Sequence, residues 1–260
     1  MTYIPGGINN PMTSTGDMIS GGTAGAATRL VAGIDGQTLQ MIGGVPSWFD
    51  GLGGRALIGG GTTTGGGLTN TIDYVGIATL GNATDFGDLT VARDLTSSCS
   101  SATRGLWNGG NGTVIDYITI ATTGNATTFG ALSVYSDQGA SLANSTRGIT
   151  AIGYSFGDSN IIEYVTIATI GNSTDFGDLS VARYNSAGLA STTRGVIGGG
   201  TVISGPTAQN VIDYVTIATT GNATDFGDLT ISVGALAGFS GQTRGIFGGG
   251  TTSANVPLNF

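Results

Sequence analysis

The residues of this 260-residue sequence that could do chemistry are recurring pairs of carboxylates. Two aspartates stand three residues apart in three places, at Asp85 and Asp88, Asp175 and Asp178, and Asp225 and Asp228. Such pairs could hold Ca²⁺ together with carbonyl oxygens, or could be the two carboxylates of glycoside hydrolysis. We favour a third interpretation, in which they cap turns. Ten of the 16 acidic residues occupy three equivalent positions of a repeat, and an active site is rarely copied in every repeat.

The basic residues exclude several classes of enzyme. All eight are arginine, and the sequence has neither lysine nor histidine. It therefore lacks the residues for a Schiff base, a P-loop, a Ser-His-Asp triad or a histidine-ligated zinc. We predict that the protein is not an enzyme and has no catalytic residue, no metal site and no cofactor.

Charge and hydropathy limit the partners. Charged residues make up 9% of the sequence and the net charge is −8, which repels nucleic acid and offers no basic patch to anionic lipid. The mean hydropathy of +0.22 and the regularly spaced Ile, Val, Tyr and Phe predict a folded protein rather than a disordered one. No stretch approaches the roughly 18 apolar residues of a membrane span, so we expect no membrane insertion. The single cysteine, Cys99, is expected to act as a small buried hydrophobe.

A repeat covers most of the chain. Four segments align without a gap: Ile72–Leu89, Ile115–Leu132, Ile162–Leu179 and Ile212–Leu229. In each of them a Tyr precedes a Phe by 12 residues and the arginine of the next Thr-Arg-Gly by 30, so this block is rigid. The connection from an arginine to the following Tyr instead spans 19, 13, 17 or 20 residues, so every length change falls in one connection per repeat. A period of about 47 residues suits a unit of four strands better than a solenoid coil.

The residue types of the repeat predict β-structure. Glycine supplies 49 of the 260 residues, which disfavours helix. Ile162–Thr169 is rich in β-branched residues and neither of its faces is fully polar, so we expect strands that are covered on both sides. Gly171–Thr174 supplies turn residues before Phe176, which predicts a hairpin. We interpret the Asn-X-Thr sequences as parts of the same turns rather than as glycosylation sites; they begin at Asn82, Asn125, Asn172 and Asn222.

The variable connections are the candidate binding surface, because loops of unequal length at one end of a repeat array are where such surfaces form. Their aromatic side chains could stack on a ligand, and their polar side chains could bond to it. The candidates are Trp107, Asn108, Asn111, Tyr154, Phe156, Asp158, Asn160, Thr201, Ser204 and Gln209. Trp107 aligns with Ile197 of a predicted strand, which favours burial, whereas both outcomes stay open for Tyr154 and Phe156.

Arginines and acidic residues of the repeat are candidates for structural ion pairs. An arginine opens a predicted strand at Arg55, Arg104, Arg147, Arg194 and Arg244. An acidic residue precedes the Tyr of each repeat at Asp73, Asp116, Glu163 and Asp213. We expect the two sets to pair between neighbouring strands or sheets, each exposed pair contributing about 0.2–1 kcal/mol.

The repeat resembles a known pattern. Gly-Gly at the end of one strand, an acidic-Tyr pair on the next, an aromatic further on and an arginine before the following unit are similar to the kelch-type β-propeller repeat, although kelch repeats usually carry Trp closer to the Tyr. The Ile-Asp-Tyr-Val-Thr-Ile-Ala-Thr-Thr-Gly-Asn-Ala-Thr-Asp-Phe-Gly unit also resembles repeats of bacteriophage structural proteins, notably those of cyanobacterial viruses. The resemblance spans about residues 55–250. It implies an all-β fold, a small kelch-like β-propeller.

The number of blades stays open between four and five. Five arginines open strands while four Tyr-to-Phe hairpins are complete, which fits four blades with a spare strand or five with one incomplete. Thr251–Phe260 is a candidate for the closing or intersubunit strand.

Residues 1–54 do not follow the repeat, so we predict a separate module there and a repeat domain at 55–260. Four segments resemble a short β-rich module of phage tail fibres: Gly16–Gly22, Thr28–Leu30, Gly33–Leu39 and Gly43–Trp48. This resemblance implies a homotrimer and attachment to other virion proteins through residues 1–54.

The resemblances imply a non-enzymatic structural protein of a phage virion, a tail-fibre or capsid-fibre component assembled in the host cytoplasm. We expect it to adhere to a host surface glycan or protein through the variable connections. Two alternatives stay open: a decoration protein that only stabilises the particle, and a tail spike that degrades polysaccharide.

Overall fold

The computed structural model describes residues 18–21, 27–30, 38–42, 45–49, 54–77, 79–203, 207–241 and 243–253. These residues form antiparallel sheets of two to four strands and no helix, which confirms the all-β prediction. Accordingly, that part of the chain has no helix of the length and apolarity needed to cross a membrane. The chain divides into two compact units, Met1–Ala56 with Val75–Ala83, and Leu57–Tyr74 with Thr84–Phe260.

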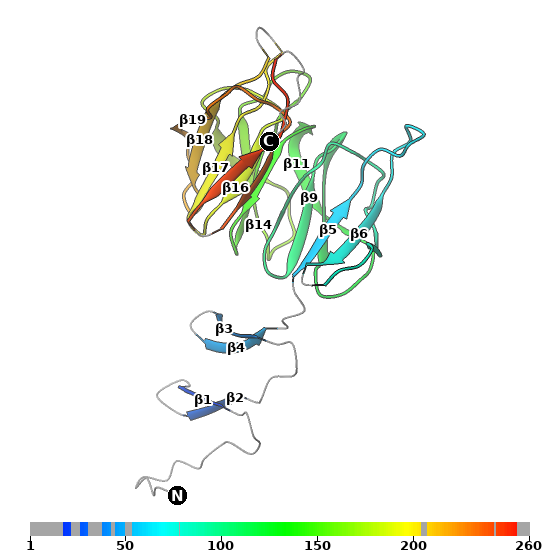
Figure 1. The fold of residues 1–260 in the computed structure, drawn as a ribbon, viewed down its shortest axis with the longest axis vertical. Coiled ribbons are helices and arrows are strands. Elements are labelled where there is room, and N and C mark those ends of the chain that lie inside the picture. The colour runs from blue at the N-terminus through cyan, green and yellow to red at the C-terminus, as the bar shows by residue number, and fades with distance from the viewer. Residues whose placement is uncertain are drawn as a thin grey trace, which may run out of the picture. The chain divides into compact units, whose positions relative to one another are not determined.

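Two short hairpins belong to the first unit (Figure 1). β1 (Met18–Gly21) pairs with β2 (Ala27–Leu30), and β3 (Thr38–Ile42) pairs with β4 (Val45–Phe49). Pro46 lies opposite Met41 in the second hairpin. A two-stranded sheet tolerates proline because each strand has a free edge that needs no backbone donor. The trimerisation and attachment expected of residues 1–54 stay predictions.

The described repeat residues form five sheets, named A to E in chain order. A complete sheet has a first strand, an Arg strand that carries or follows the repeat arginine, a Tyr strand and a Phe strand. Sheet A has the last three, which are β5 (Arg55–Gly59), β6 (Thr71–Gly76) and β7 (Thr84–Asp88). Sheet B has all four, which are β8 (Ser97–Ser100), β9 (Arg104–Asn108), β10 (Gly112–Thr119) and β11 (Thr127–Ser136).

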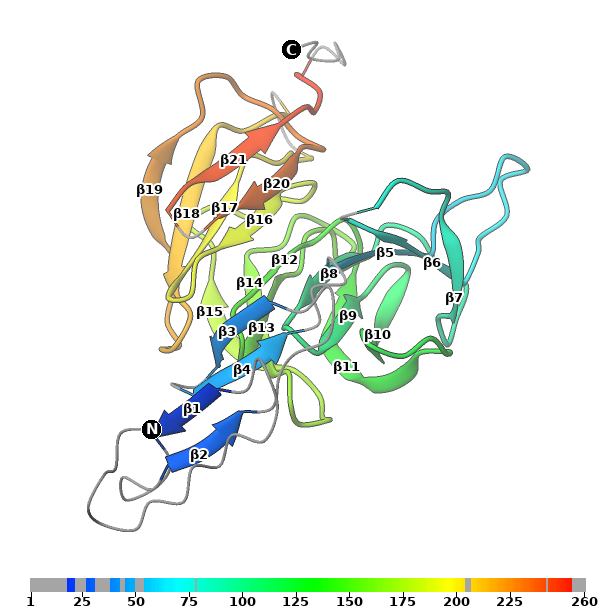
Figure 2. The same ribbon diagram turned by 60° about the horizontal axis from the view of Figure 1, so that its bottom comes forward.

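Sheets C and D repeat the four-stranded order of sheet B. Sheet C consists of β12 (Ala140–Ala143), β13 (Arg147–Ala151), β14 (Ile161–Thr166) and β15 (Thr174–Asp178). Sheet D consists of β16 (Ala187–Ala190), β17 (Arg194–Gly198), β18 (Val211–Thr216) and β19 (Thr224–Asp228). Sheet E has a first strand and an Arg strand, β20 (Ala237–Ser240) and β21 (Gly245–Gly248). First strands of neighbouring sheets from B to E lie side by side, so these sheets follow one another in chain order (Figure 2).

A bulge in the Tyr-to-Phe hairpin explains the glycine after the Phe. In sheet C the pairing shifts register between Ile162 and Glu163, and equivalent shifts occur in sheets A and D. Gly177, opposite the shift, has a φ of 143°, which residues with a Cβ rarely adopt. A Cβ there would also lie 2.4 Å from the carbonyl oxygen of Gly221 in the next sheet. The glycine therefore serves both the bulge and the close approach of the neighbouring turn.

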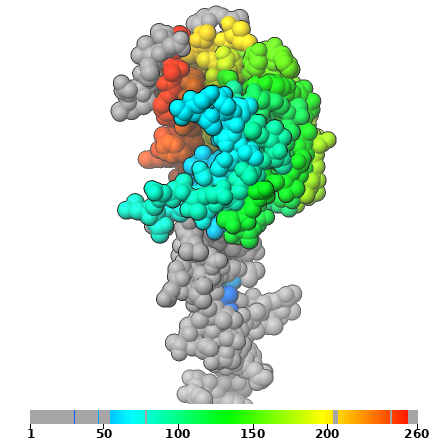
Figure 3. Space-filling view, turned by 90° about the vertical axis from the view of Figure 1, so that its right-hand side faces the viewer, coloured from blue at the N-terminus to red at the C-terminus, as the bar shows by residue number. Residues whose placement is uncertain are grey.

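The core lies between the sheets. Phe86 and Leu89 of sheet A pack against Trp107 and Ile118 of sheet B, and equivalent clusters join B to C and C to D. On the face drawn in Figure 3, the side chains from sheet A (cyan) to sheet B (green) form a continuous surface. Each fully buried side chain of this size contributes about 1.5–3 kcal/mol. The expectation that strands are covered on both sides is confirmed for sheets B and C.

Candidate binding surface

The connections between Arg and Tyr strands lie at one end of the second unit, which we call the connection end. Arg and Tyr strands are antiparallel neighbours, so each connection leaves its sheet at that end. There it pairs with the segment that precedes the first strand of its own sheet, through bridges between Asp137 and Tyr154, Tyr184 and Thr201, and Gly234 and Thr251. The structure thus brings the connections of unequal length together.

Phe156 is the most exposed aromatic side chain of the connection end. It is 81% exposed and has a φ of +58°, the left-handed conformation that costs a residue with a Cβ about 1–2 kcal/mol. A tight turn holds it there, in which the Ser155 N–H donates to the Gly157 carbonyl at 2.9 Å. Its ring lies 4.8 Å from the ring of Tyr135, centroid to centroid, at an angle of 35°. The ring of Phe156 therefore lies at the surface beside Tyr135, on a turn in a left-handed conformation.

Ordered carboxylates lie beside this aromatic pair. The Tyr135 hydroxyl donates to Asp137 at 2.6 Å, and this hydrogen bond, with smaller effects of burial and of the Asp137 charge, raises the pKa of Tyr135 to about 12. Asn111 donates its backbone N–H to Asp137 and its side-chain amide to Asp94, the latter at 2.6 Å. Thr62 donates its hydroxyl to the same Asp94 at 2.7 Å. Asn111 thus links the carboxylates of Asp94 and Asp137 across the connection end. These bonds are compatible with a role in binding and with a role in structure.

Tyr154 and Asp158 hold the connection of sheet C in place. The Tyr154 ring is half-buried and meets the ring of Tyr184 edge-on, with centroids 6.0 Å apart. The Asp158 carboxylate accepts the backbone N–H of Ile203 at 2.9 Å, from the connection of sheet D. Both residues therefore position the surface, and their partly exposed atoms stay available to a ligand.

Trp107 and Asn108 do not belong to the surface. Trp107 is 5% exposed, and a Cβ on Gly59 would lie 2.9 Å from its indole, so it packs in the core between sheets A and B. Asn108 is 3% exposed and donates to the Ser141 hydroxyl at 3.1 Å. The alignment of Trp107 with Ile197 predicts this burial correctly.

Three of the remaining candidates lie at the connection end with structural bonds of their own: Asn160, Thr201 and Gln209. Asn160 is exposed and its carbonyl accepts the N–H of Leu179 at 2.7 Å. Thr201 and Gln209 are half-buried in the connection of sheet D. Ser204 lies outside the described residues.

The strand-opening arginines do not form the predicted ion pairs in sheets B to D. The guanidinium carbons of Arg104, Arg147 and Arg194 lie 4.7, 4.4 and 4.6 Å from the centroid of the Tyr ring in their own sheet. Arg104 and Arg147 also donate to a carbonyl of the next sheet. Stacking on Tyr leaves the planar guanidinium free to donate at its edge, so no carboxylate is needed. The pairing of Arg55, Arg244 and Asp73 stays a prediction.

Other arginines pair with the acidic residues that precede Tyr. Arg93 contacts Asp116 at 3.0 Å and Arg183 contacts Asp213 at 2.9 Å, and both pairs are buried. Burial lowers the pKa of each arginine, and the adjacent carboxylate opposes this effect. Glu163 instead accepts hydrogen bonds from Ser133 and Ser173. The missed signal is an arginine four residues after the Leu that ends the repeat segment, present after Leu89 and Leu179.

The Asp pairs and the Asn of the hairpin turns have structural contacts. The backbone N–H groups of Asp88 and Asp178 donate to Asn125 and Asn222 of the next sheet, each at 3.1 Å. The Asp225 carboxylate accepts the N–H of Gly227 at 3.0 Å within β19, so the turn capping that the sequence favours stays a prediction. The described residues bring no three acidic, His or Cys side chains together as a metal site.

Comparison with known proteins gives a likeness of fold. No family model and no curated protein matches the sequence. The solved structure of YjhT aligns with a TM-score of 0.65 over 91% of this chain and 84% of that chain, at 9% sequence identity. At this identity the likeness shows the fold alone.

Proposed function

We propose that sheets A to E are blades of a small β-propeller, four or five in number, and that the protein is a bacteriophage fibre component that attaches the virion to its host. The resemblance of the repeats and of residues 1–54 to phage proteins supports this assignment. In it, residues 1–54 form the trimeric, virion-attached part, and the protein is not an enzyme and carries no cofactor. Its location is the virion, after assembly in the host cytoplasm.

The display of Phe156 is the observation that carries the binding role. An exposed ring fixed by a turn and by Tyr135 loses little entropy on binding, and it can stack on the apolar face of a sugar. The neighbouring Asp94 and Asp137 accept hydrogen bonds from hydroxyl or amino groups. Their charge, with the net charge of −8, disfavours sialic and uronic acids. The proposed ligand is therefore a neutral or amine-bearing host glycan.

A glycan array with purified protein tests this proposal. Wild type is expected to bind neutral or amino sugars, and Phe156→Ala to weaken binding about tenfold. Tyr135→Phe, which removes the hydroxyl and keeps the ring, is expected to bind with a smaller loss. Ile170→Ala is the matched control, because Ile170 is 55% exposed and lies in a hairpin turn at the opposite end.

Two results would contradict the proposal. A wild-type protein that binds no glycan and no host-cell surface would favour a decoration role. Release of reducing ends from host polysaccharide would favour a degrading spike.

A further inference from the structure

The interfaces A–B, B–C and C–D use the same backbone hydrogen bonds. Between sheets C and D, the N–H groups of Gly221 and Ala223 donate to the carbonyls of Phe176 and Asp178, each at 2.7 Å. The Asp178 N–H donates in return to Asn222. The same three bonds join A to B and B to C. Each of these three interfaces therefore has a forward face, which carries the Phe, and a backward face, which carries the next hairpin turn.

An arginine and an isoleucine complete the pattern at two of these interfaces. Arg104 on a forward face donates to the carbonyl of Ile167 at 2.8 Å, and Arg147 donates to that of Ile217 at 2.9 Å. Ile167 and Ile217 are 2% and 0% exposed, since they pack against the forward face. The backward face thus contributes both a buried side chain and an acceptor.

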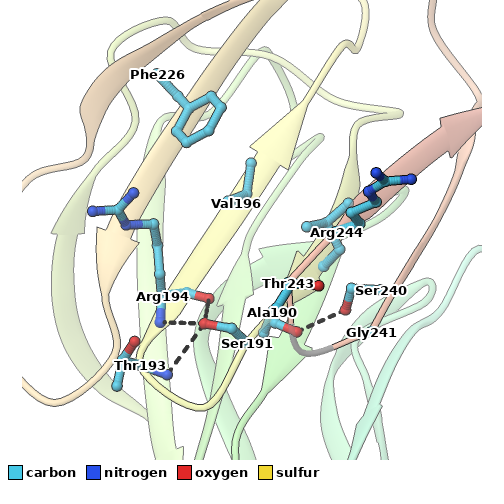
Figure 4. Close-up of a pocket in the computed structure, with 12 residues that line it drawn as sticks. Ala190, Ser191, Thr193, Arg194, Val196, Phe226, Ser240, Gly241, Thr243 and Arg244 are labelled. Carbon is cyan, nitrogen blue, oxygen red and sulfur yellow. Dashed lines mark hydrogen bonds between the residues drawn. The ribbon is translucent and has the colours of Figure 1, made fainter.

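The described residues leave the forward face of sheet D uncovered. Phe226 is 53% exposed, whereas the equivalent Phe residues of sheets B and C are 1% and 2% exposed. A Cβ on Gly227 would meet no atom within 4 Å, although the equivalent glycines of sheets A to C lie against the next turn. Figure 4 shows the groove beside this face, lined by Arg194, Val196 and Phe226 on one side and by Arg244 on the other. Phe226 and Arg194 have the positions that other sheets use for the next hairpin.

The backward face of sheet A is likewise left exposed by the residues that the structure describes. Ile77 is 68% exposed, and Ala83 of the following turn is exposed, whereas its equivalent Ala126 in sheet B is 9% exposed. Asn82 occupies the position at which Asn125, Asn172 and Asn222 accept a hydrogen bond from the preceding sheet. One chain therefore presents both halves of the repeated interface, each with its apolar residue exposed.

We propose that the forward face of sheet D binds the backward face of sheet A in a second copy of the chain. Phe226 packs on Ile77 of the second copy, and Arg194 donates to the carbonyl of that Ile77. The N–H groups of Gly81 and Ala83 donate to the carbonyls of Phe226 and Asp228. The contact is head-to-tail, so it extends from copy to copy or closes into a ring.

Strand order adds a second match. Sheet A lacks a first strand, and sheet E supplies one in β20. Both β21 of the first copy and β5 of the second copy are Arg strands. When the two faces meet, these strands compete for one position beside β20. In this proposal β5 replaces β21, which gives up the contact of Phe247 with Gly198 and places the core residue Leu57 where Ile246 is 51% exposed. β20 then completes sheet A of the second copy to four strands, as in sheets B to D.

Two variants of the full chain test the proposal by mixing. Phe226→Arg removes the forward face and Ile77→Asp removes the backward face, so neither variant is expected to form the contact with itself. An equal mixture keeps one intact face of each kind and is expected to add one contact per pair of chains, read by light scattering and analytical ultracentrifugation. Wild type is expected to associate further as its concentration rises. The single variants give the baseline, which includes any association through residues 1–54.

A disulfide makes the test specific. In a Cys99→Ala background, chains with Asn82→Cys are expected to cross-link to chains with Asp228→Cys. The intrachain pair Asp178→Cys with Asn222→Cys, at the equivalent positions of the C–D interface, is the positive control, and Phe156→Arg is the control for surface charge. Wild type that never exceeds the baseline, or a mixture that gains no contact while the control disulfide forms, overturns the proposal. Either result leaves the glycan-binding proposal intact.

Discussion

The interfaces B–C and C–D bury an acidic residue at the same place with different partners. Asp213 of sheet D contacts Arg183 at 2.9 Å and accepts the Ser180 hydroxyl at 2.6 Å. Glu163 of sheet C, which is longer by one methylene, accepts hydrogen bonds from the hydroxyls of Ser133 and Ser173. The comparison teaches that a buried carboxylate in this fold needs enough donors and does not need an arginine as such.

Among the variants of these two interfaces, we expect Asp213→Ala to lower the free energy of unfolding most. It leaves the fully buried guanidinium of Arg183 without its counter-charge, because the bonds of Arg183 to the carbonyls of Val181 and Ile197 do not neutralise it. Breaking a buried pair in this way costs about 3–5 kcal/mol. Urea denaturation, followed by tryptophan fluorescence, measures the loss in the free energy of unfolding.

Asp225→Ala is the control for this variant, because Asp225 is an exposed aspartate of the same hairpin. It is expected to change the free energy of unfolding by less than about 1 kcal/mol. Equal losses in the two variants would contradict the role assigned to the buried pair.

Glu163→Gln is expected to have a smaller effect at the B–C interface. The substitution keeps the length of the side chain and removes the charge that strengthens its hydrogen bonds. Hydrogen bonds to charged groups contribute about 1.5–3 kcal/mol and neutral ones about 0.5–1.5 kcal/mol, so we expect a loss of about 1–3 kcal/mol in the same denaturation experiment. A loss as large as that of Asp213→Ala would mean that the serine network is no substitute for an ion pair.

The sequence predicts the hairpins better than it predicts what joins them. Its regular Tyr-to-Phe spacing and its β-branched residues predict an all-β chain with strands covered on both sides; the described residues are all-β, and the coverage is observed in sheets B and C. The partner of Asp213 is missed because Arg183 lies in the connection from sheet C to sheet D and an arginine stands at this position in only two repeats. A one-dimensional repeat shows which residues recur, but it does not show which of them face each other across an interface.

The candidate site shows the same limit. Phe156 lies in a connection whose length varies, which is a signal of a loop and is visible in the sequence. The side chain of Tyr135 lies on β11, inside a strand, and only the three-dimensional arrangement brings its ring beside Phe156. Asp94 and Asp137 follow Phe strands rather than Arg strands, so a search confined to the variable connections misses them.

A triple variant that converts the C–D interface to the B–C chemistry sharpens the comparison. Arg183→Ser, Asp213→Glu and Ala223→Ser together copy Ser136, Glu163 and Ser173 of the other interface. We expect the triple variant to lose about 1 kcal/mol, less than Asp213→Ala alone, because the three positions are coupled and the acid regains donors. If the triple variant instead loses as much free energy of unfolding as the three single variants added together, each network depends on residues beyond these three side chains.

Near neutral pH the titration of Cys99 has the smallest expected effect on the free energy of unfolding. This residue reports on the B–C interface alone. Its sulfur lies where the equivalent Leu142 lies at the C–D interface: a Cβ on Gly148 would be 2.9 Å from the Cys99 sulfur, and one on Gly195 would be 2.6 Å from Leu142. Desolvation raises the pKa of Cys99 to about 12, from an ordinary value of 9.0, and a hydrogen bond from Asn108 opposes this only in part.

The sign of the pH effect follows from that shift. Below pH 9 the thiol is protonated in both states and contributes no pH dependence. Above pH 9 the unfolded chain loses the proton while the folded chain keeps it, so stability falls by about 1.4 kcal/mol per pH unit until pH 12. The difference in free energy of unfolding between wild type and Cys99→Ala, measured from pH 7 to 10.5, isolates this contribution from the tyrosines. A difference that stays constant with pH, or a native thiol that iodoacetamide alkylates at pH 8 as fast as in urea, would mean that sheets B and C separate readily at this point.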